Sequence, residues 1–140
     1  MTAAPIRKAA RFAGAWVLES WELFRNAELD AYPHGPDGEG RLVLSSNGQL
    51  SAFLQRAGWA EADASVKVSW DRFIAFGGDW RLDDEKLVFE LAYASESRWI
   101  GKALIRPARI EKKKLIYETP PISNRKGETL VNRLSWRKFE

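Results

Sequence analysis

Few side chains in this sequence could carry acid–base or ionic chemistry inside a folded domain. Glu22 lies in an aromatic and aliphatic run, residues 16–24, and Arg106 alternates with Leu104. A carboxylate enclosed by apolar groups has a raised pKa and can act as a general acid or base. A buried arginine needs a carboxylate, from Glu22, Glu90 or a bound ligand. The sequence therefore offers a candidate acid–base group and a candidate anchor for an anionic group, unless Glu22 is solvated at a rim or simply paired with Arg106.

His34 is the chain's single histidine, and the chain contains no cysteine. The absence of cysteine excludes disulfides, thiol nucleophiles and metal sites built on thiolates. His34 lies in a loop rich in proline and glycine, residues 32–38, where it is a candidate gate or general base, although a loop histidine is usually solvent-exposed. Nothing beside it supports a Ser-His-Asp triad or a metal centre. We therefore expect neither a metal nor a cofactor.

Length and composition indicate one globular domain, residues 1–140. The chain has 140 residues, of which 45% are hydrophobic, and a chain of this size buries roughly two-thirds of its unfolded surface. Residues 1–11 are basic but lack the apolar stretch of a secretory signal. No apolar run approaches the ~20 residues of a membrane span. We therefore expect a cytoplasmic protein without a membrane span.

Charge is distributed unevenly along the chain. Residues 98–140 hold 12 Lys and Arg against 4 Asp and Glu, whereas residues 1–97 hold 10 against 15. A basic C-terminal third is able to bind nucleic acid or an acidic partner. It also arises when alternate strand positions form a solvated face, and this interpretation needs no partner. Nucleic-acid binding is therefore a minor alternative.

The elements that must position these side chains are mostly strands. After a short helix at residues 5–12, β-type runs occupy residues 16–24, 41–45, 50–56, 73–82, 87–94, 98–110, 115–119 and 129–139. Asn47-Gly48 is a strong hairpin signal, and Gly77-Gly78 within a strand predicts a bulge or a close backbone approach. In residues 57–72, alanine and valine mix with charged residues, and this pattern predicts a helix or a lid-like excursion. The pattern predicts an all-β fold, a single antiparallel up-and-down barrel of about eight or nine strands, whose interior has room for side chains or one small ligand.

Several motifs resemble those of a known family. Gly14-Ala15-Trp16 follows the short helix, and further motifs are Tyr32-Pro33-His34-Gly35, Gly40-Arg41-Leu42, Asn47-Gly48-Gln49-Leu50-Ser51, Phe73-Ile74-Ala75-Phe76-Gly77-Gly78, Trp99-Ile100-Gly101, Arg106 and Thr119-Pro120-Pro121. From about residue 10 to 138 the chain resembles the bacterial and fungal lipocalin-like domain family, a group of calycin-type barrels with a central cavity. The resemblance implies three structural residues at the closed end: Gly14, Trp16 as the plug, and Arg137 packed across that tryptophan. Members of the family often carry a histidine near the position of Glu90, so the resemblance makes Glu90 a catalytic candidate beside Glu22 and His34.

Strand periodicity assigns residues to faces of the barrel. With Trp16 inside, Leu18, Ser20, Glu22 and Phe24 share its face, whereas a single bulge would turn Trp21 inward instead. In the strand of Glu90, the opposite face is the more apolar one, so the pattern alone points Glu90 outward. We expect the ligand-binding wall to include Phe24, Phe53, Gln55, Trp80, Arg106 and Tyr117. Aromatic side chains, with seven tryptophans in the chain, build walls for a flat apolar ligand or simply fill a small barrel.

The leading functional interpretation is a binding module that takes one small, mainly hydrophobic molecule into the barrel. Some relatives in the family that the chain resembles look like accessory proteins or cyclases of secondary metabolism, so the resemblance suggests secondary metabolism as one setting for such a module. The alternative is a cyclase or isomerase without a cofactor, acting on a hydrophobic biosynthetic intermediate in the same cavity by acid–base or orientation effects. The sequence does not name the ligand, and it leaves open whether the chain forms a homodimer.

Overall fold

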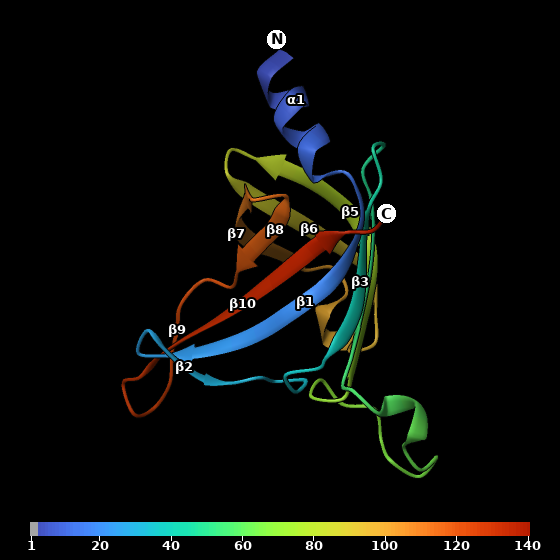
Figure 1. The fold of residues 1–140 in the computed structure, drawn as a ribbon, viewed down its shortest axis with the longest axis vertical. Helices are drawn as coiled ribbons and strands as arrows, with labels where there is room; N and C mark the ends of the chain where they lie inside the picture. The colour runs from blue at the N-terminus through green and yellow to red at the C-terminus, as the bar shows by residue number, and fades with distance from the viewer. Residues whose placement is uncertain (1–2) are drawn as a thin grey trace.

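In the computed structural model, which describes residues 3–140 and their side chains from residue 8, eight strands form a closed antiparallel barrel (Figure 1). These strands are β1 (Gly14–Arg25), β3 (Glu39–Leu44), β4 (Gln49–Gln55), β5 (Phe73–Asp83), β6 (Lys86–Ala94), β7 (Ala103–Glu111), β8 (Lys114–Glu118) and β10 (Thr129–Lys138). Each strand pairs with the next in this order, and β10 pairs with β1 to close the ring. The predicted up-and-down barrel is confirmed.

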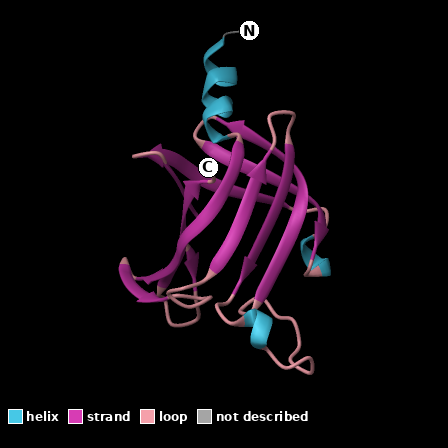
Figure 2. Cartoon of the chain, turned by 45° about the vertical axis from the view of Figure 1, so that its right-hand side comes forward, coloured by secondary structure: helices cyan, strands magenta, loops and turns pink. Residues whose placement is uncertain are grey.

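Within the described residues, two short strands and three helical elements lie outside the ring of eight strands (Figure 2). Strand β2 (Glu28–Ala31) pairs with the last residues of β1, and β9 (Ile122–Ser123) pairs with the first residues of β10. Neither was expected as a strand. Each has at most four residues and pairs only with the end of one longer strand. The helices are α1 (Ala3–Phe12) and the 3₁₀ turns η1 (Trp59–Glu61) and η2 (Ser97–Trp99). None of the helices in residues 3–140 has the length and apolar composition needed to cross a bilayer.

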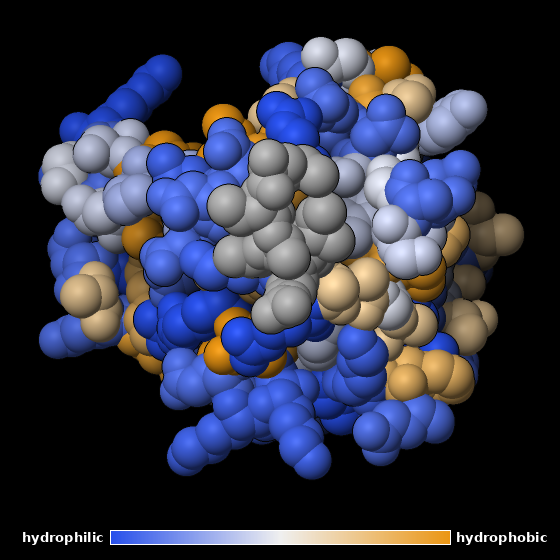
Figure 3. Space-filling view, turned by 90° about the horizontal axis from the view of Figure 1, so that it is seen from above, coloured by the Kyte–Doolittle hydropathy of each residue, from blue (hydrophilic) through white to orange (hydrophobic). Residues whose placement is uncertain are grey.

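The two ends of the barrel differ in the length of their connections. At the end beside α1, tight turns join β3 to β4, β5 to β6 and β7 to β8. The predicted Asn47-Gly48 hairpin is confirmed there, with Gly48 at φ 93°. Seen from this side, the surface is largely hydrophilic (Figure 3). All the longer connections lie at the opposite end, which we call the open end.

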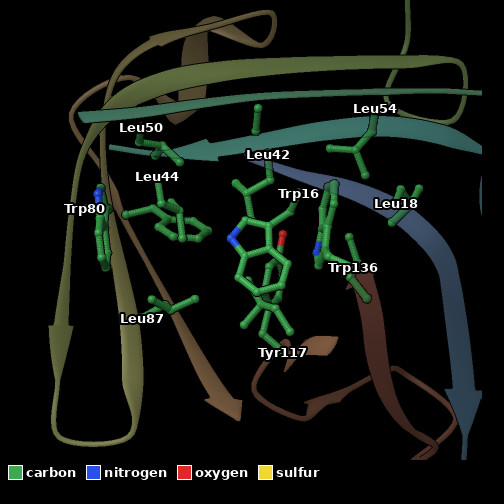
Figure 4. Packing of buried hydrophobic residues seen from close by; sticks show 14 of the residues in the cluster. Trp16, Leu18, Leu42, Leu44, Leu50, Leu54, Trp80, Leu87, Tyr117 and Trp136 are labelled. Carbon is green, nitrogen blue, oxygen red and sulfur yellow. The ribbon is translucent and has the colours of Figure 1, made fainter. Parts of the chain in front are cut away.

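The closed end is plugged by an aromatic and leucine core (Figure 4). Trp16 lies in the middle of this core, with Leu42, Leu44 and Trp136 around it. The Trp16 indole donates a hydrogen bond from Nε1 to the carbonyl of Phe12 at 2.9 Å, which ties the end of α1 to the start of β1. Trp16 therefore occupies the plug position that the resemblance implies.

The residue that covers Trp16 is not the expected one. Arg137 is exposed, and its predicted packing across Trp16 is wrong. Lys138 lies there instead, with its Nζ 4.5 Å from the centroid of the Trp16 ring. Because Trp136 points into the core, strand alternation turns Arg137 outward and Lys138 back toward the plug.

Two bulges adjust the faces of the barrel. In β1 the pairing register with β10 shifts between Leu18 and Ser20, so Trp21 points inward after Leu18. The simple alternation that put Glu22 and Phe24 inside is therefore wrong, and the alternative with one bulge is right. In β5 the register shifts between Gly77 and Gly78, which confirms the bulge predicted from the two glycines.

The excursion between β4 and β5, residues 56–72, protrudes from the open end (Figure 1). The part of the excursion beyond η1 points away from the barrel and does not close over it, so the expected lid-like excursion exists without covering the mouth. Its return segment does contact the barrel, because Trp70 lies 6.4 Å from Trp21 between ring centroids. Trp59 stacks on Phe73 at 6.3 Å, which holds the base of the excursion against β5.

Candidate functional site

A cavity of about 230 Å³ lies inside the barrel, between the closed-end core and the open end. Its wall comes from seven of the eight barrel strands, from η2 and from the connection after β8. Because successive residues of a strand point to opposite faces, alternate positions of these strands reach it. The lining residues are Trp21, Leu54, Ile74, Phe76, Phe89, Trp99, Leu104, Arg106, Tyr117, Thr119, Asn132 and Leu134. The wall is therefore mostly aromatic and aliphatic, with a small polar group of side chains.

Arg106 is the charged residue of this wall. It pairs in register with Leu87, which is fully buried, so its side chain starts on the inner face of β7. It takes part in none of the ion pairs among the described residues. The hydrogen bond found for it runs from Nη1 to the carbonyl of Ile105 at 3.2 Å. Burial lowers the pKa of Arg106 below its usual value, but a guanidinium stays protonated at physiological pH, so the cavity contains a positive charge without a carboxylate in its described lining.

Tyr117 contributes a second polar group beside Arg106. It is 3% exposed and packs edge-on against Phe89 at 5.9 Å between ring centroids. Tyr117 pairs with Ala108, two residues beyond Arg106, and such diagonal neighbours lie roughly 7–8 Å apart on one sheet face. Burial raises the pKa of Tyr117 to about 12, while the nearby charge of Arg106 acts in the opposite direction. The phenol is therefore neutral at physiological pH and able to donate a hydrogen bond.

The remaining polar side chains of the wall lie where β10 meets β1 and the segment after β8. Trp21 donates from Nε1 to Oδ1 of Asn132 at 2.8 Å, and the backbone N–H of Asn132 donates to Oγ1 of Thr119 at 2.9 Å. Since an indole N–H can only donate, it fixes the amide orientation of Asn132. The amide N–H₂ of Asn132 and the hydroxyl proton of Thr119 remain as donors at the cavity.

His34 is fully buried beneath the open-end loops, which differs from the usual exposure of a loop histidine. Its ring lies 4.5 Å from the Trp21 ring, and Nε2 is 2.7 Å from the carbonyl oxygen of Trp70. Because a carbonyl accepts, Nε2 carries the proton and Nδ1 is a bare acceptor, with no hydrogen-bond partner among the described residues. Arg56 clamps the same region by donating to the carbonyls of Pro33 and Asp71, each at 3.0 Å. His34 thus lies behind Trp21 and outside the cavity lining.

Burial is the largest influence on the pKa of His34 and lowers it from 6.5. The hydrogen bond to Trp70 acts in the opposite direction, Arg56 lowers the pKa further, and Asp71 raises it. The imidazole is therefore neutral near pH 7. It packs the loop of residues 32–38 and the end of the excursion against the back of Trp21.

Two predicted catalytic carboxylates lie on the outer face of the barrel. Glu22 pairs in register with Arg133, which alternates with the cavity residue Asn132 and so faces outward. Glu90 is exposed and forms an ion pair with Arg81 at 2.9 Å. For Glu90 the apolar pattern of its strand correctly predicted an outward side chain. For Glu22 the bulge in β1 turned the side chain from the predicted inner face to the outer face.

Of the six predicted wall residues, Arg106 and Tyr117 line the cavity and the other four do not. Phe24 lies under the Arg133 guanidinium at 4.5 Å on the outside. Phe53 is 52% exposed, because Leu50, Ala52 and Leu54 are the inner residues of β4. Gln55 shares the outer face of Phe53 and bonds to Glu39 at 3.2 Å. Trp80 is buried in the closed-end core, where its Nε1 donates to the carbonyl of Ser45 at 2.7 Å.

Sequence reasoning missed several wall residues. Trp99 reaches the cavity from η2, in a segment expected to be strand, Thr119 from the connection after β8, and Asn132 from β10. For Asn132 the available signal was its place between Leu130 and Leu134 at alternate positions of the strand.

Comparison with protein families matches residues 13–139 to a family described as the lipocalin-like domain. Comparisons with curated proteins and with solved structures find no match. The family match spans all eight barrel strands and every residue of the cavity wall.

Proposed function

This chain belongs to the lipocalin-like domain family, and on this premise we propose that its barrel binds one small, mainly hydrophobic molecule. The observation that supports the proposal is the cavity of about 230 Å³, with aromatic and aliphatic residues from both halves of the chain in its wall. Small-molecule sites are concave and mostly apolar, with a few polar groups that fix orientation. The cavity has this composition.

The cavity volume sets the scale of the ligand. Pockets for drug-sized ligands have volumes of about 300–1,000 Å³, so about 230 Å³ suits a smaller molecule, such as a medium-length hydrocarbon chain with one polar group. A longer molecule extends between the loops of the open end.

Filling the cavity tests the proposal. We expect 1-octanol to bind the protein, with perturbed NMR signals of Leu54, Phe89 and Leu134, which line the wall. Leu104→Trp narrows the cavity and should weaken this binding. Ile105→Trp is the matched control, because Ile105 is the next residue and is 44% exposed on the outer face. Equal binding by both variants, or no binding by the wild-type protein, contradicts the proposal.

The geometry favours binding over the cyclase or isomerase alternative. The lining of the described cavity includes no carboxylate and no histidine, whereas Glu22 and Glu90 lie on the outer face and His34 lies behind Trp21. Acid–base catalysis needs a titratable group within hydrogen-bond reach of the substrate and with a pKa near the working pH, and Tyr117 in the lining has its pKa raised to about 12. The proposed role in secondary metabolism depends on the ligand, which identification of a co-purified small molecule would test.

A further inference from the structure

We propose that the natural ligand is an amphipathic organic anion, whose acidic group binds Arg106 and whose apolar body fills the aromatic part of the cavity. This inference rests on the proposed function and adds the chemical class of the ligand. It follows from the charge of the cavity wall and from the hydrogen-bond donors that surround that charge.

The charge of Arg106 is unbalanced inside the barrel. The described lining contains this one cation and no acidic side chain. The ion pairs found among residues 3–140 involve exposed or half-buried groups, and Arg106 is in none of them. Arg109 makes a clear comparison, because it lies on the outer face of the same strand and pairs with Glu111 at 2.9 Å. The side chain of Arg106 is half-buried, and desolvation lowers its pKa. A partly desolvated cation gains from a nearby negative charge, which an anionic ligand would supply.

The neighbouring polar groups also suit an anion. Burial raises the pKa of Tyr117 to about 12, so its phenol is neutral at physiological pH and is able to donate its hydroxyl proton. The Asn132 carbonyl is already occupied by Trp21, so its side chain offers the amide N–H₂. A carboxylate accepts from all of these donors and pairs with a guanidinium in a bidentate geometry. A cationic ligand would meet like charge, and a neutral ligand would leave Arg106 unbalanced.

The aromatic part of the wall supplies the site for the apolar body. Phe76 and Phe89 lie 6.2 Å apart between ring centroids, and Leu54 and Leu134 also line this part of the cavity. Arg106 therefore lines the same cavity as a substantial apolar surface. A small inorganic anion would bind the guanidinium without using that surface, so the geometry selects an anion that carries a hydrocarbon body.

Calorimetric titration with three ligands of equal chain length tests the inference: octanoate, 1-octanol and octylammonium. The wild-type protein should bind octanoate about 10- to 100-fold more tightly than 1-octanol, as expected for a charge-assisted hydrogen bond in a desolvated site. Octylammonium should bind least. In Arg106→Met the affinity for octanoate should fall to that of the same variant for 1-octanol or below. Arg109→Met removes one positive charge from the outer face and should keep the octanoate preference.

The outcomes separate this inference from the proposed function. If 1-octanol binds and octanoate shows no preference, water solvates Arg106 and the inference is overturned, while hydrophobic binding stands. If Arg106→Met keeps the octanoate preference, the inference is equally wrong. If neither 1-octanol nor octanoate binds, both proposals fail. Methionine matches the arginine stem in shape, and urea unfolding of both variants checks that the barrel is intact.

Discussion

The ammonium group of Lys138 covers the indole of Trp16: its Nζ lies 4.5 Å from the ring centroid and donates to the carbonyl of Ala13 at 2.7 Å. One side chain near the end of β10 thus contacts both the plug and the junction between α1 and β1. Gly14 makes room for it, because a Cβ there would lie 2.8 Å from Nζ. Lys138 thus links the plug to the α1–β1 junction, and the small size of Gly14 permits this contact.

Removing the Lys138 ammonium should destabilise the barrel. Lys138→Met keeps the aliphatic stem but loses the cation–π contact and the charged hydrogen bond, and we expect a loss of about 1–2 kcal/mol in the free energy of unfolding. Arg137→Met is the control, because Arg137 is exposed, and it should change stability by less than about 0.5 kcal/mol. Urea denaturation measures both. A larger loss for Arg137→Met would restore the original expectation for that residue.

Gly78 should tolerate no side chain. Its φ is +153°, and an added Cβ would lie 2.0 Å from the carbonyl oxygen of Glu90 on the paired strand. Gly78→Ala should therefore cost about 3 kcal/mol or more, or prevent folding. Gly101→Ala is the matched control, because Gly101 has φ +86° with no atom within 4 Å of the new Cβ. That variant should lose only about 1–2 kcal/mol, the cost of a left-handed backbone. Similar thermal denaturation midpoints for the two variants would argue against the close approach at the β5 bulge.

The strands and their order were predictable from the sequence because their signals are local. Alternating apolar residues and turn residues such as Asn47-Gly48 mark where a strand begins and ends. The Gly77-Gly78 pair likewise marked the β5 bulge. A barrel then follows, since closure removes the exposed edges of so many short antiparallel strands.

The direction of individual side chains was harder to predict. Nothing in residues 18–20 shows the β1 bulge, which reverses the faces of Glu22 and Phe24. His34 is buried by contacts with Trp21 and Trp70, which are distant in sequence. In β4, by contrast, the polar residues Ser51 and Gln55 share the face of Phe53, and they already indicated an outer face. Bulges and long-range packing, rather than local propensity, account for the misplaced site residues.

Stability should fall as the pH drops through the ordinary histidine range. Burial lowers the pKa of His34 below 6.5, so the unfolded chain binds a proton more readily than the folded one. The stability contributed by neutral His34 is full above this ordinary value and is lost as the pH falls toward the lowered folded pKa. Urea denaturation at about pH 7.5 and about pH 5.5 should show lower stability at the acidic value.

His34→Gln is the control for this pH dependence. Glutamine does not titrate, and its amide N–H₂ is able to donate to the Trp70 carbonyl as Nε2 does now. Because His34 is the single histidine, the variant should show a much smaller change in stability between the two pH values. An unchanged pH dependence in the variant would mean that other groups carry it.

The hydrogen bond between Trp21 and Asn132 should couple two strands at the cavity wall. Asn132→Leu leaves the Trp21 N–H, which bonds to Asn132 at 2.8 Å, without its acceptor, and we expect a loss of about 1–3 kcal/mol. Trp21→Phe removes the donor together with some packing. Once the donor is gone, the second substitution removes no hydrogen bond, so the double variant should be more stable than the sum of the two single losses predicts. A coupling energy of about 1 kcal/mol in urea denaturation is the expected result. Additive losses would mean that a water molecule replaces the missing acceptor and that the bond does not hold β1 against β10.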